Sequence, residues 1–579
     1  MCKHLIMTET RAIGQRVIWA GMALSLMCLA YFYMLDRIWF FSTGFSPVFR
    51  FLLAPDLKSA WTSLAICCLA ALWNRPGPLL GVVDFLGEHA VWAVSVCVIL
   101  FAILAITVYQ QYPLAMDEYA AVFQAKIFAS GHLSGRLPPG YVDWMVVRGF
   151  NGEFLLASHD TGRVIEVYWP GFAALLAPFE FFRMPWLCNA LLAGLALLLV
   201  YRITAQITRD KRAAGWALLF TLSSGAFVAD AISFYSMQAH LTANLLFAAL
   251  LMQPSPSRAL GAGLIGSLAL ILHNPVPHTL FAIPWLIAIA VDRSRWRHMP
   301  PLFLGYLPGV ILGLGWLLFR LKVATAVQGM TSLSGIAAGV FTLPNAEVLN
   351  MRAACFAKMW VWAAPCLFVF AAAGYVRYRE NSGARLLACS AVLTLAGYFF
   401  VAFDQGHGWG YRYFHSAWGV VPILAGCAMA DGERMNLKVA SFAGACAILS
   451  LLVIVPLQLS EIRQFISQHL AQLPPPRRPG NNVYFIHPRG GFYVADMVQI
   501  DPLLRDPDLL LVSRGTELDA KMINENWPDA IKIGSGPSYD QWYLGPMDRR
   551  QRMPGAQNTT RFVLRANPYE PIPPSAADR

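Results

Sequence analysis

The chain has 579 residues, of which 57% are apolar and only 13% are charged. A soluble protein carries about 25% charged residues, so this composition excludes a soluble globular enzyme and indicates a polytopic membrane protein. The formal charge of +11 does not indicate a nucleic-acid partner, because the basic residues cluster in short loops between apolar segments. That distribution is typical of cytoplasmic loops, and we expect membrane lipids around the chain instead of nucleic acid.

The eleven cysteines lie mostly inside apolar segments. None falls between Tyr109 and Trp186 or after Cys446, so the regions expected outside the cytoplasm need no disulfide. No cysteine spacing of the metal-binding kind is present. The sequence therefore predicts no metal site.

Apolar segments predict about thirteen membrane spans. They lie near residues 17–35, 58–73, 90–109, 186–201, 213–230, 237–252, 259–272, 276–291, 301–319, 359–376, 386–403, 416–430 and 439–457. If the chain crosses the membrane at each of these spans, the basic loops and the N-terminus lie on the same side. Basic loops are typically cytoplasmic, which predicts a cytoplasmic N-terminus. The odd number of spans then puts the C-terminus outside. With its short loops, the chain suits a bacterial inner membrane with the tail in the periplasm.

We expect three parts along the chain. Residues 1–89 hold two additional spans, and residues 90–458 hold the main module with a long outer loop over residues 110–185. Residues 474–579 begin with a proline-rich linker and are expected to form a small extracytoplasmic α/β domain. Its predicted elements are strands at 483–486, 509–512 and 530–533 and a helix at 517–526.

The segment that follows the span at 90–109 carries adjacent carboxylates, Asp117 and Glu118. They open an amphipathic stretch with apolar residues at helical spacing, and we expect Asp117 to cap this helix and remain ionised. A charged carboxylate at a membrane surface can activate a hydroxyl nucleophile. A cap without any chemical role is the alternative reading of Asp117.

Other polar residues fall at span ends on the same predicted side as Asp117. Ionisable groups at membrane depth are functional candidates by default, but buried histidines can also serve packing alone. Arg412 can be a snorkelling anchor or the ion-pair partner of Asp404. Ser158, His159 and Asp160 suggest a hydrolase triad, although adjacency in sequence is not triad geometry. The set comprises Asp230, Tyr235, His240, His273, His278, Arg320, Lys322, Asp404, His407, Tyr411 and Arg412.

Three motifs in order resemble the GT-C membrane glycosyltransferases, in particular the protein O-mannosyltransferase and aminoarabinose transferase superfamily. They are Asp117-Glu118, the helix end Ala129–Leu133, and Tyr168–Phe172, in which a tryptophan replaces the first proline of the family pattern. Gly408–Tyr413 resembles a late extracytoplasmic loop of bacterial relatives, without its proline. The resemblance covers roughly residues 90–460.

This resemblance implies transfer of a sugar from a polyprenyl phosphate to an acceptor hydroxyl, with inversion at the anomeric carbon. Asp117 would be the general base, and Glu118 would orient the acceptor or a metal. The resemblance requires no bound metal, although a divalent cation is compatible with it. The donor phosphate would contact Arg412, Tyr411, His273 and Lys322. The acceptor or sugar would contact His159, Tyr168, Asp404 and His407.

Two other functions fit parts of the pattern. A solute transporter would explain the many spans, the intramembrane histidines and the midplane prolines Pro275 and Pro277, but no inverted repeat is present. A polysaccharide polymerase or ligase would also have a large outer loop, placed later in the chain. The sequence specifies neither the sugar nor whether the acceptor is a lipid, a glycan or a protein.

Overall fold

The computed structural model describes residues 2–39, 47–73, 77–324, 343–401, 407–430, 437–474, 481–506 and 508–545. The chain divides into two compact units. The helical unit comprises Met1–Gly131, Tyr168–Leu321 and Met330–Gln468, and the α/β unit comprises His132–Val167, Lys322–Gly329 and His469–Arg579. The sequence instead predicted a module at 90–458 and a separate tail at 474–579. The difference is that the middle of the long outer loop belongs with the tail.

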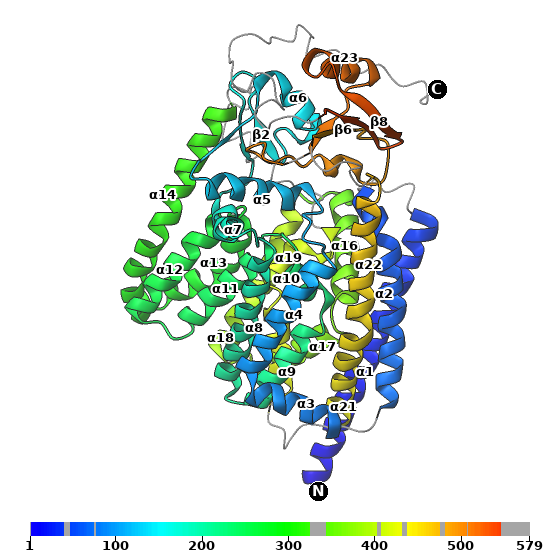
Figure 1. Ribbon diagram of the computed structural model, residues 1–579. Coiled ribbons are helices and arrows are strands. Elements are labelled where there is room, and N and C mark those ends of the chain that lie inside the picture. The colour runs from blue at the N-terminus through cyan, green and yellow to red at the C-terminus, as the bar shows by residue number, and fades with distance from the viewer. Residues whose placement is uncertain are drawn as a thin grey trace. The chain divides into compact units, whose positions relative to one another are not determined.

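The helices of the helical unit pack around a buried apolar core (Figure 1). Their bounds are α1 (Cys2–Met34), α2 (Pro47–Leu72), α3 (Gly77–Glu88), α4 (Ala90–Thr107), α5 (Met116–Ala129), α7 (Gly171–Phe181), α8 (Leu187–Thr208), α9 (Lys211–Leu222), α10 (Gly225–Ile232), α11 (Met237–Leu251), α12 (Pro256–Ile271), α13 (Val276–Val291), α14 (Met299–Ala324), α16 (Ala346–Val361), α17 (Leu367–Tyr378), α18 (Ser382–Gly397), α19 (Arg412–His415), α20 (Val420–Ala428), α21 (Leu437–Leu449) and α22 (Val455–Leu470).

Among the described residues, seven helices are long and apolar enough to cross a membrane. The pair α9 and α10, bent by 69°, makes an eighth if it counts as one broken span. Helices α7, α11, α12, α13 and α17 are apolar but have fewer than 18 residues, and a perpendicular span needs about 20. The protein is thus a helical membrane protein, while the count of thirteen spans and the sidedness derived from it stay predictions.

The predicted span at 359–376 is not one helix. Helix α16 ends at Val361, and α17 begins at Leu367 after a break that contains Pro365 and Cys366. Proline donates no backbone hydrogen bond, and Cys366 has a φ of 66°, which no continuous α-helix contains. Hydropathy alone could not reveal this break, because apolar residues continue across it from Met359 to Val376.

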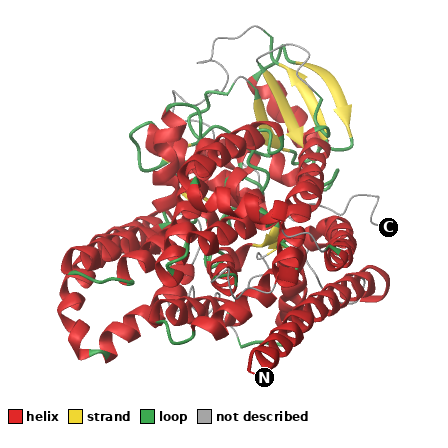
Figure 2. Cartoon of the chain, turned by 90° about the horizontal axis from the view of Figure 1, so that it is seen from below, coloured by secondary structure: helices red, strands yellow, loops and turns green. Residues whose placement is uncertain are grey.

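The strands of the α/β unit form two sheets, and Figure 2 shows the larger sheet in yellow. Strands β1 (Gly135–Arg136), β3 (Arg163–Glu166) and β2 (Leu155–Ala157) are antiparallel neighbours in that order. The larger sheet has the order β7 (Leu509–Val512), β6 (Asn482–Ile486), β9 (Tyr539–Tyr543) and β8 (Ile531–Gly536), and only the β6–β7 pair is parallel. Strands β6, β7 and β8 and helix α23 (Thr516–Asn526) lie at the predicted positions, whereas β9 and the three strands of the smaller sheet were not anticipated.

The early loop supplies part of the core beside this sheet. Val147 packs against a buried cluster that includes Ile486, Val494 and Val512. The indole Nε1 of Trp144, on the short helix α6 (Val142–Met145), donates to Asp519 Oδ1 on α23 at 3.3 Å. The loop and the tail therefore share one hydrophobic core within the α/β unit.

Candidate active site

The first turn of α5 separates the roles of the two adjacent carboxylates. The N-cap of α5 is Ala115, so the prediction that Asp117 caps this helix is wrong. Glu118 caps the start of the helix instead, since its Oε2 accepts the backbone N–H groups of Leu114 at 3.0 Å and Ala115 at 3.1 Å. The Ala115 N–H is one of the donors that a helix N-terminus leaves without an intrahelical partner, and the Leu114 N–H comes just before the helix. Asp117 therefore has its carboxylate available for other contacts.

Two side chains from distant segments bind the Asp117 carboxylate. Arg412 Nη1 donates to Oδ2 at 2.9 Å, and the Tyr168 hydroxyl donates to Oδ1. The Arg412 guanidinium also lies over the Tyr235 ring, 4.4 Å from its centroid, an arrangement that stabilises a cation. In the ion pair, 13% of the Asp117 side chain and 9% of that of Arg412 are exposed. The site is a nearly buried ion pair held by two tyrosines.

The environment favours the ionised form of Asp117. Burial alone would raise its pKa, but the Arg412 charge and the Tyr168 hydrogen bond outweigh burial, and the pKa falls below its ordinary value. An opposite charge within a few ångströms has this effect on a carboxyl group. Asp117 is therefore a carboxylate at neutral pH.

Glu118 has the opposite balance. Burial raises its pKa to about 7, against hydrogen bonds from the backbone and from Tyr109 that favour the anion. Its Oε1 accepts the Tyr109 hydroxyl and the Phe234 N–H, both at 2.9 Å. With the two donors on Oε2, both oxygens are occupied by the protein itself. Glu118 fastens the start of α5 to the turn that carries Tyr235.

The segment Tyr168–Phe172 aligns Tyr168 with Asp117. The Trp169 N–H donates to the His273 carbonyl at 3.1 Å, and the Phe172 N–H donates to the Leu272 carbonyl at 2.9 Å. A Cβ on Gly171 would lie 2.6 Å from the Ile271 carbonyl oxygen. Only glycine permits this approach. The order Trp-Pro-Gly thus docks the start of α7 against the end of α12.

His273 lies directly against Tyr168, with the two ring centroids 3.9 Å apart. Burial lowers the pKa of His273 to about 4, although the nearby Asp117 charge opposes this shift. At neutral pH the imidazole is uncharged. It can form hydrogen bonds with a phosphate, but it supplies no positive charge there.

A tight two-strand turn places Arg412. Strands β4 (His407–Gly408) and β5 (Gly410–Tyr411) pair across Trp409, and Gly410 has a φ of 86°, which favours glycine. The Tyr411 hydroxyl is buried and lacks a hydrogen-bond partner among the residues that the structure describes. A hydroxyl in that state is available to a ligand.

The remaining predicted site residues belong to the α/β unit or lie outside the described residues. Lys322 is exposed and belongs to the α/β unit, as does His159, whose Nε2 lies 3.0 Å from Asp143 Oδ1. Ser158 Oγ accepts the Thr161 N–H, so the structure gives no triad of Ser158, His159 and Asp160. Asp404 and the side chain of His407 lie outside the described residues.

Sequence reasoning missed a fully buried ion pair. Lys358 Nζ on α16 lies 2.6 Å from Asp56 Oδ2 on α2, and both side chains are 0% exposed. The Trp362 indole donates to Asp56 Oδ1 at 2.7 Å. A carboxylate between apolar residues was the available signal. It was missed because the predicted spans began at residues 58 and 359, so that Asp56 and Lys358 both fell just outside them.

His415 was also missed. Its Nδ1 lies 2.7 Å from Asp230 Oδ2, and its Nε2 lies 3.2 Å from Gln238 Oε1. Asp230 was predicted as a candidate. Its partner His415 lies one turn after Arg412 on α19, and no sequence pattern distinguished it. This pair secures the element that carries Arg412.

No family model and no curated protein matches the chain. Among solved structures, it is similar to ArnT from Cupriavidus metallidurans bound to undecaprenyl phosphate, with 14% identity, a TM-score of 0.46, and coverage of 77% of this chain and 97% of that chain. The apo structure of the same protein matches with 14% identity, a TM-score of 0.43, and coverage of 78% and 98%. The chemistry is assigned from the site residues alone.

Proposed function

We propose that this protein is an inverting glycosyltransferase that moves a sugar from a polyprenyl phosphate to an acceptor hydroxyl at the outer membrane face. The observation that carries the proposal is the nearly buried pair of Asp117 and Arg412. It combines a carboxylate that can accept a proton with a guanidinium that can bind a phosphate, and the reaction needs both. The acceptor is a lipid, a glycan or a protein.

Asp117 accepts the proton of the acceptor hydroxyl. The acceptor oxygen attacks the anomeric carbon while the bond from that carbon to the phosphate oxygen breaks. The electron pair leaves with the polyprenyl phosphate, and the proton ends on Asp117. A positioned base typically contributes 10²–10⁴-fold to such a step. One displacement of this kind inverts the anomeric centre.

Arg412 binds the phosphate. A guanidinium carries five N–H donors, and a phosphate can accept two of them in parallel. Because the Arg412 charge lowers the pKa of Asp117, a phosphate that draws Arg412 away from Asp117 makes this carboxylate more basic. Donor binding would thus activate the base only when the substrate is in place.

The other site residues have supporting roles in this proposal. Tyr168 and Tyr411 offer hydroxyls to the sugar or phosphate, and neutral His273 offers a hydrogen bond. Glu118 positions α5, since four donors already occupy its oxygens; the scheme therefore assigns it no metal. Lys322, His159, Asp404 and His407 remain proposed contacts to donor or acceptor. The N-terminus would be cytoplasmic and the α/β unit periplasmic in a bacterial inner membrane.

The bend of 69° between α9 and α10 favours transport as the second candidate function, because transporters use broken helices. A transfer assay separates the two. The protein in nanodiscs is incubated with polyprenyl-phosphate hexoses and pentoses together with lipid, glycan and protein acceptors, and the release of free polyprenyl phosphate is measured. We expect release by the wild type and a loss in Asp117→Asn. Release from neither protein with any donor would contradict the glycosyltransferase.

A further inference from the structure

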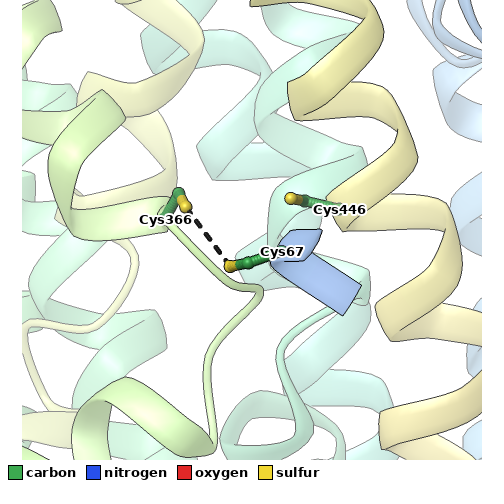
Figure 3. A group of neighbouring side chains, drawn as sticks. All are labelled: Cys67, Cys366 and Cys446. Carbon is green, nitrogen blue, oxygen red and sulfur yellow. Dashed lines mark hydrogen bonds between the residues drawn. The ribbon is translucent and has the colours of Figure 1, made fainter. Parts of the chain in front are cut away.

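Three buried cysteines from distant segments meet in the helical unit (Figure 3). They are Cys67 on α2, Cys366 in the break before α17, and Cys446 on α21. Their three sulfurs all lie within 4.8 Å of one another. The sulfurs of Cys67 and Cys366 are 3.8 Å apart although 299 residues separate them in the chain. No spacing pattern could have shown this group, because each cysteine comes from a different element.

The surrounding backbone is shaped around the sulfurs. Cys366 has a φ of 66° and lies at the break between two helices, which turns its thiol toward Cys67. On α1, a Cβ at Gly21 would lie 2.0 Å from the Cys366 sulfur. Gly21 therefore leaves the space that this thiol occupies. Ser25, one turn further along α1, has its Oγ 3.5 Å from the Cys67 sulfur.

We propose that Cys67, Cys366 and Cys446 bind one soft monovalent metal ion of the Cu(I) class. A metal–sulfur bond of about 2.3 Å places three sulfurs in a plane around one ion about 4 Å apart. The 3.8 Å between Cys67 and Cys366 fits this triangle. Thiolate ligands select soft ions such as Cu(I) over hard ions, which take oxygen ligands.

The number of ligands favours an ion of the Cu(I) class over Zn(II). Structural zinc takes four ligands, and among the described residues no histidine or carboxylate joins the three cysteines. Each sulfur that binds the ion does so as a thiolate. The released protons pass to solvent, as metal binding by cysteines requires.

The bound ion would link α2, the break before α17, and α21, independently of Asp117 and Arg412. The site thus joins the N-terminal helices to the rest of the helical unit, whichever reaction the protein catalyses.

The test is anaerobic titration of the full-length protein in detergent with Cu(I) against a chromophoric Cu(I) chelator. We expect one tightly bound ion per chain in the wild type and none in Cys67→Ser or Cys446→Ala. Cys188→Ser is the matched control, because Cys188 is also buried but lies outside the group; it should retain the ion. X-ray absorption should show sulfur as the only ligand type in the wild type.

Gel filtration checks that each variant is folded before it is compared with the wild type. The two variants change cysteines on different helices, so the test still works if one of them misfolds. Equal Cu(I) binding by the wild type and a folded Cys67→Ser would overturn the proposal. Displacement of the bound Cu(I) by an equal concentration of Zn(II) would overturn the assignment of the ion. A disulfide between Cys67 and Cys366 in the purified protein would also overturn it, by showing a redox pair instead of a metal site.

Discussion

Two neighbouring carboxylates take different roles because different groups face them. Asp117 contacts side chains, Arg412 and Tyr168, whereas Glu118 accepts mainly backbone N–H groups. The first can exchange its partners when a substrate arrives, but the second cannot without loosening α5. We therefore assign the chemistry to Asp117 and the positioning to Glu118.

Asp117→Asn is expected to lower the rate of sugar transfer by about 10²–10⁴-fold, with a smaller change in the KM for the donor. The amide keeps the shape of the side chain but cannot accept the proton. Steady-state release of polyprenyl phosphate measures both constants. Asp529→Asn, an exposed aspartate of the α/β unit, is the control and should behave as the wild type. A mutant Asp117→Asn with unchanged turnover would exclude this base.

The ion pair of His159 and Asp143 predicts a pH-dependent loop. The hydrogen bond with Asp143 raises the pKa of His159, and the same bond lowers the pKa of Asp143. The stability that His159 contributes is therefore fully present below its unfolded pKa of about 6.5 and is lost as the pH rises through its higher folded pKa. Asp143 loses its contribution only in acid.

Hydrogen exchange of β2 and β3 should accordingly become faster as the pH rises above about 6.5, beyond the intrinsic effect of pH on exchange. His159→Gln should remove this extra dependence. If His159→Gln keeps the same extra pH dependence of hydrogen exchange, a group other than His159 causes that dependence.

At the residue scale, Asp117 and Arg412 could each be predicted from sequence, but their contact could not. They are 295 residues apart, and the ion-pair partner considered for Arg412 from the sequence was Asp404, which is close in the chain. The pairing depends on how α5 and the β4–β5 turn pack, which no single-sequence pattern specifies.

At the scale of elements, the buried pair of Lys358 and Asp56 joins α16 to α2. Lys358→Met should destabilise the protein by about 3–5 kcal/mol, because it leaves the Asp56 carboxylate buried without its counter-charge. Unfolding of the protein in a mild detergent, monitored by circular dichroism, measures the loss of stability. The double variant Asp56→Asn/Lys358→Met should recover much of the stability. If the single variant unfolds at the wild-type midpoint, the pair does not hold these helices together.

The elements that sequence predicted well are those with a strong local signal. Helix α5 follows from its amphipathic spacing, and β6 and β7 follow from short apolar runs after polar residues. Strand β9, Tyr-Asp-Gln-Trp-Tyr, was missed because it mixes polar and aromatic residues without a clean alternation. The break at Cys366 was missed because the apolar composition continues across it.

At the scale of the whole molecule, the early loop and the tail fold as one unit. Deleting residues 475–579 should therefore expose Val147 and Trp144 and speed hydrogen exchange in β2 and β3, although both strands remain in the chain. Mass spectrometry of peptic peptides measures the change, with α8 of the helical unit as the internal control. Unchanged protection of β2 and β3 would show that the loop folds without the tail.

Composition alone was sufficient to predict the membrane class, because 57% apolar residues leave no other class. The shared core of loop and tail was not predictable. Val147 and Val512 are separated by most of the chain, and neither carries a signal that links it to the other.

The most direct test of the central claim is mass spectrometry of the lipids that co-purify with wild type, Asp117→Asn and Arg412→Ala. We predict that a polyprenyl-phosphate sugar accumulates on Asp117→Asn, which binds the donor but cannot transfer the sugar, and is absent from Arg412→Ala. The mass of that lipid would also define the sugar class. Only bulk phospholipid on all three proteins would contradict the account of Arg412 as a phosphate site and favour transport.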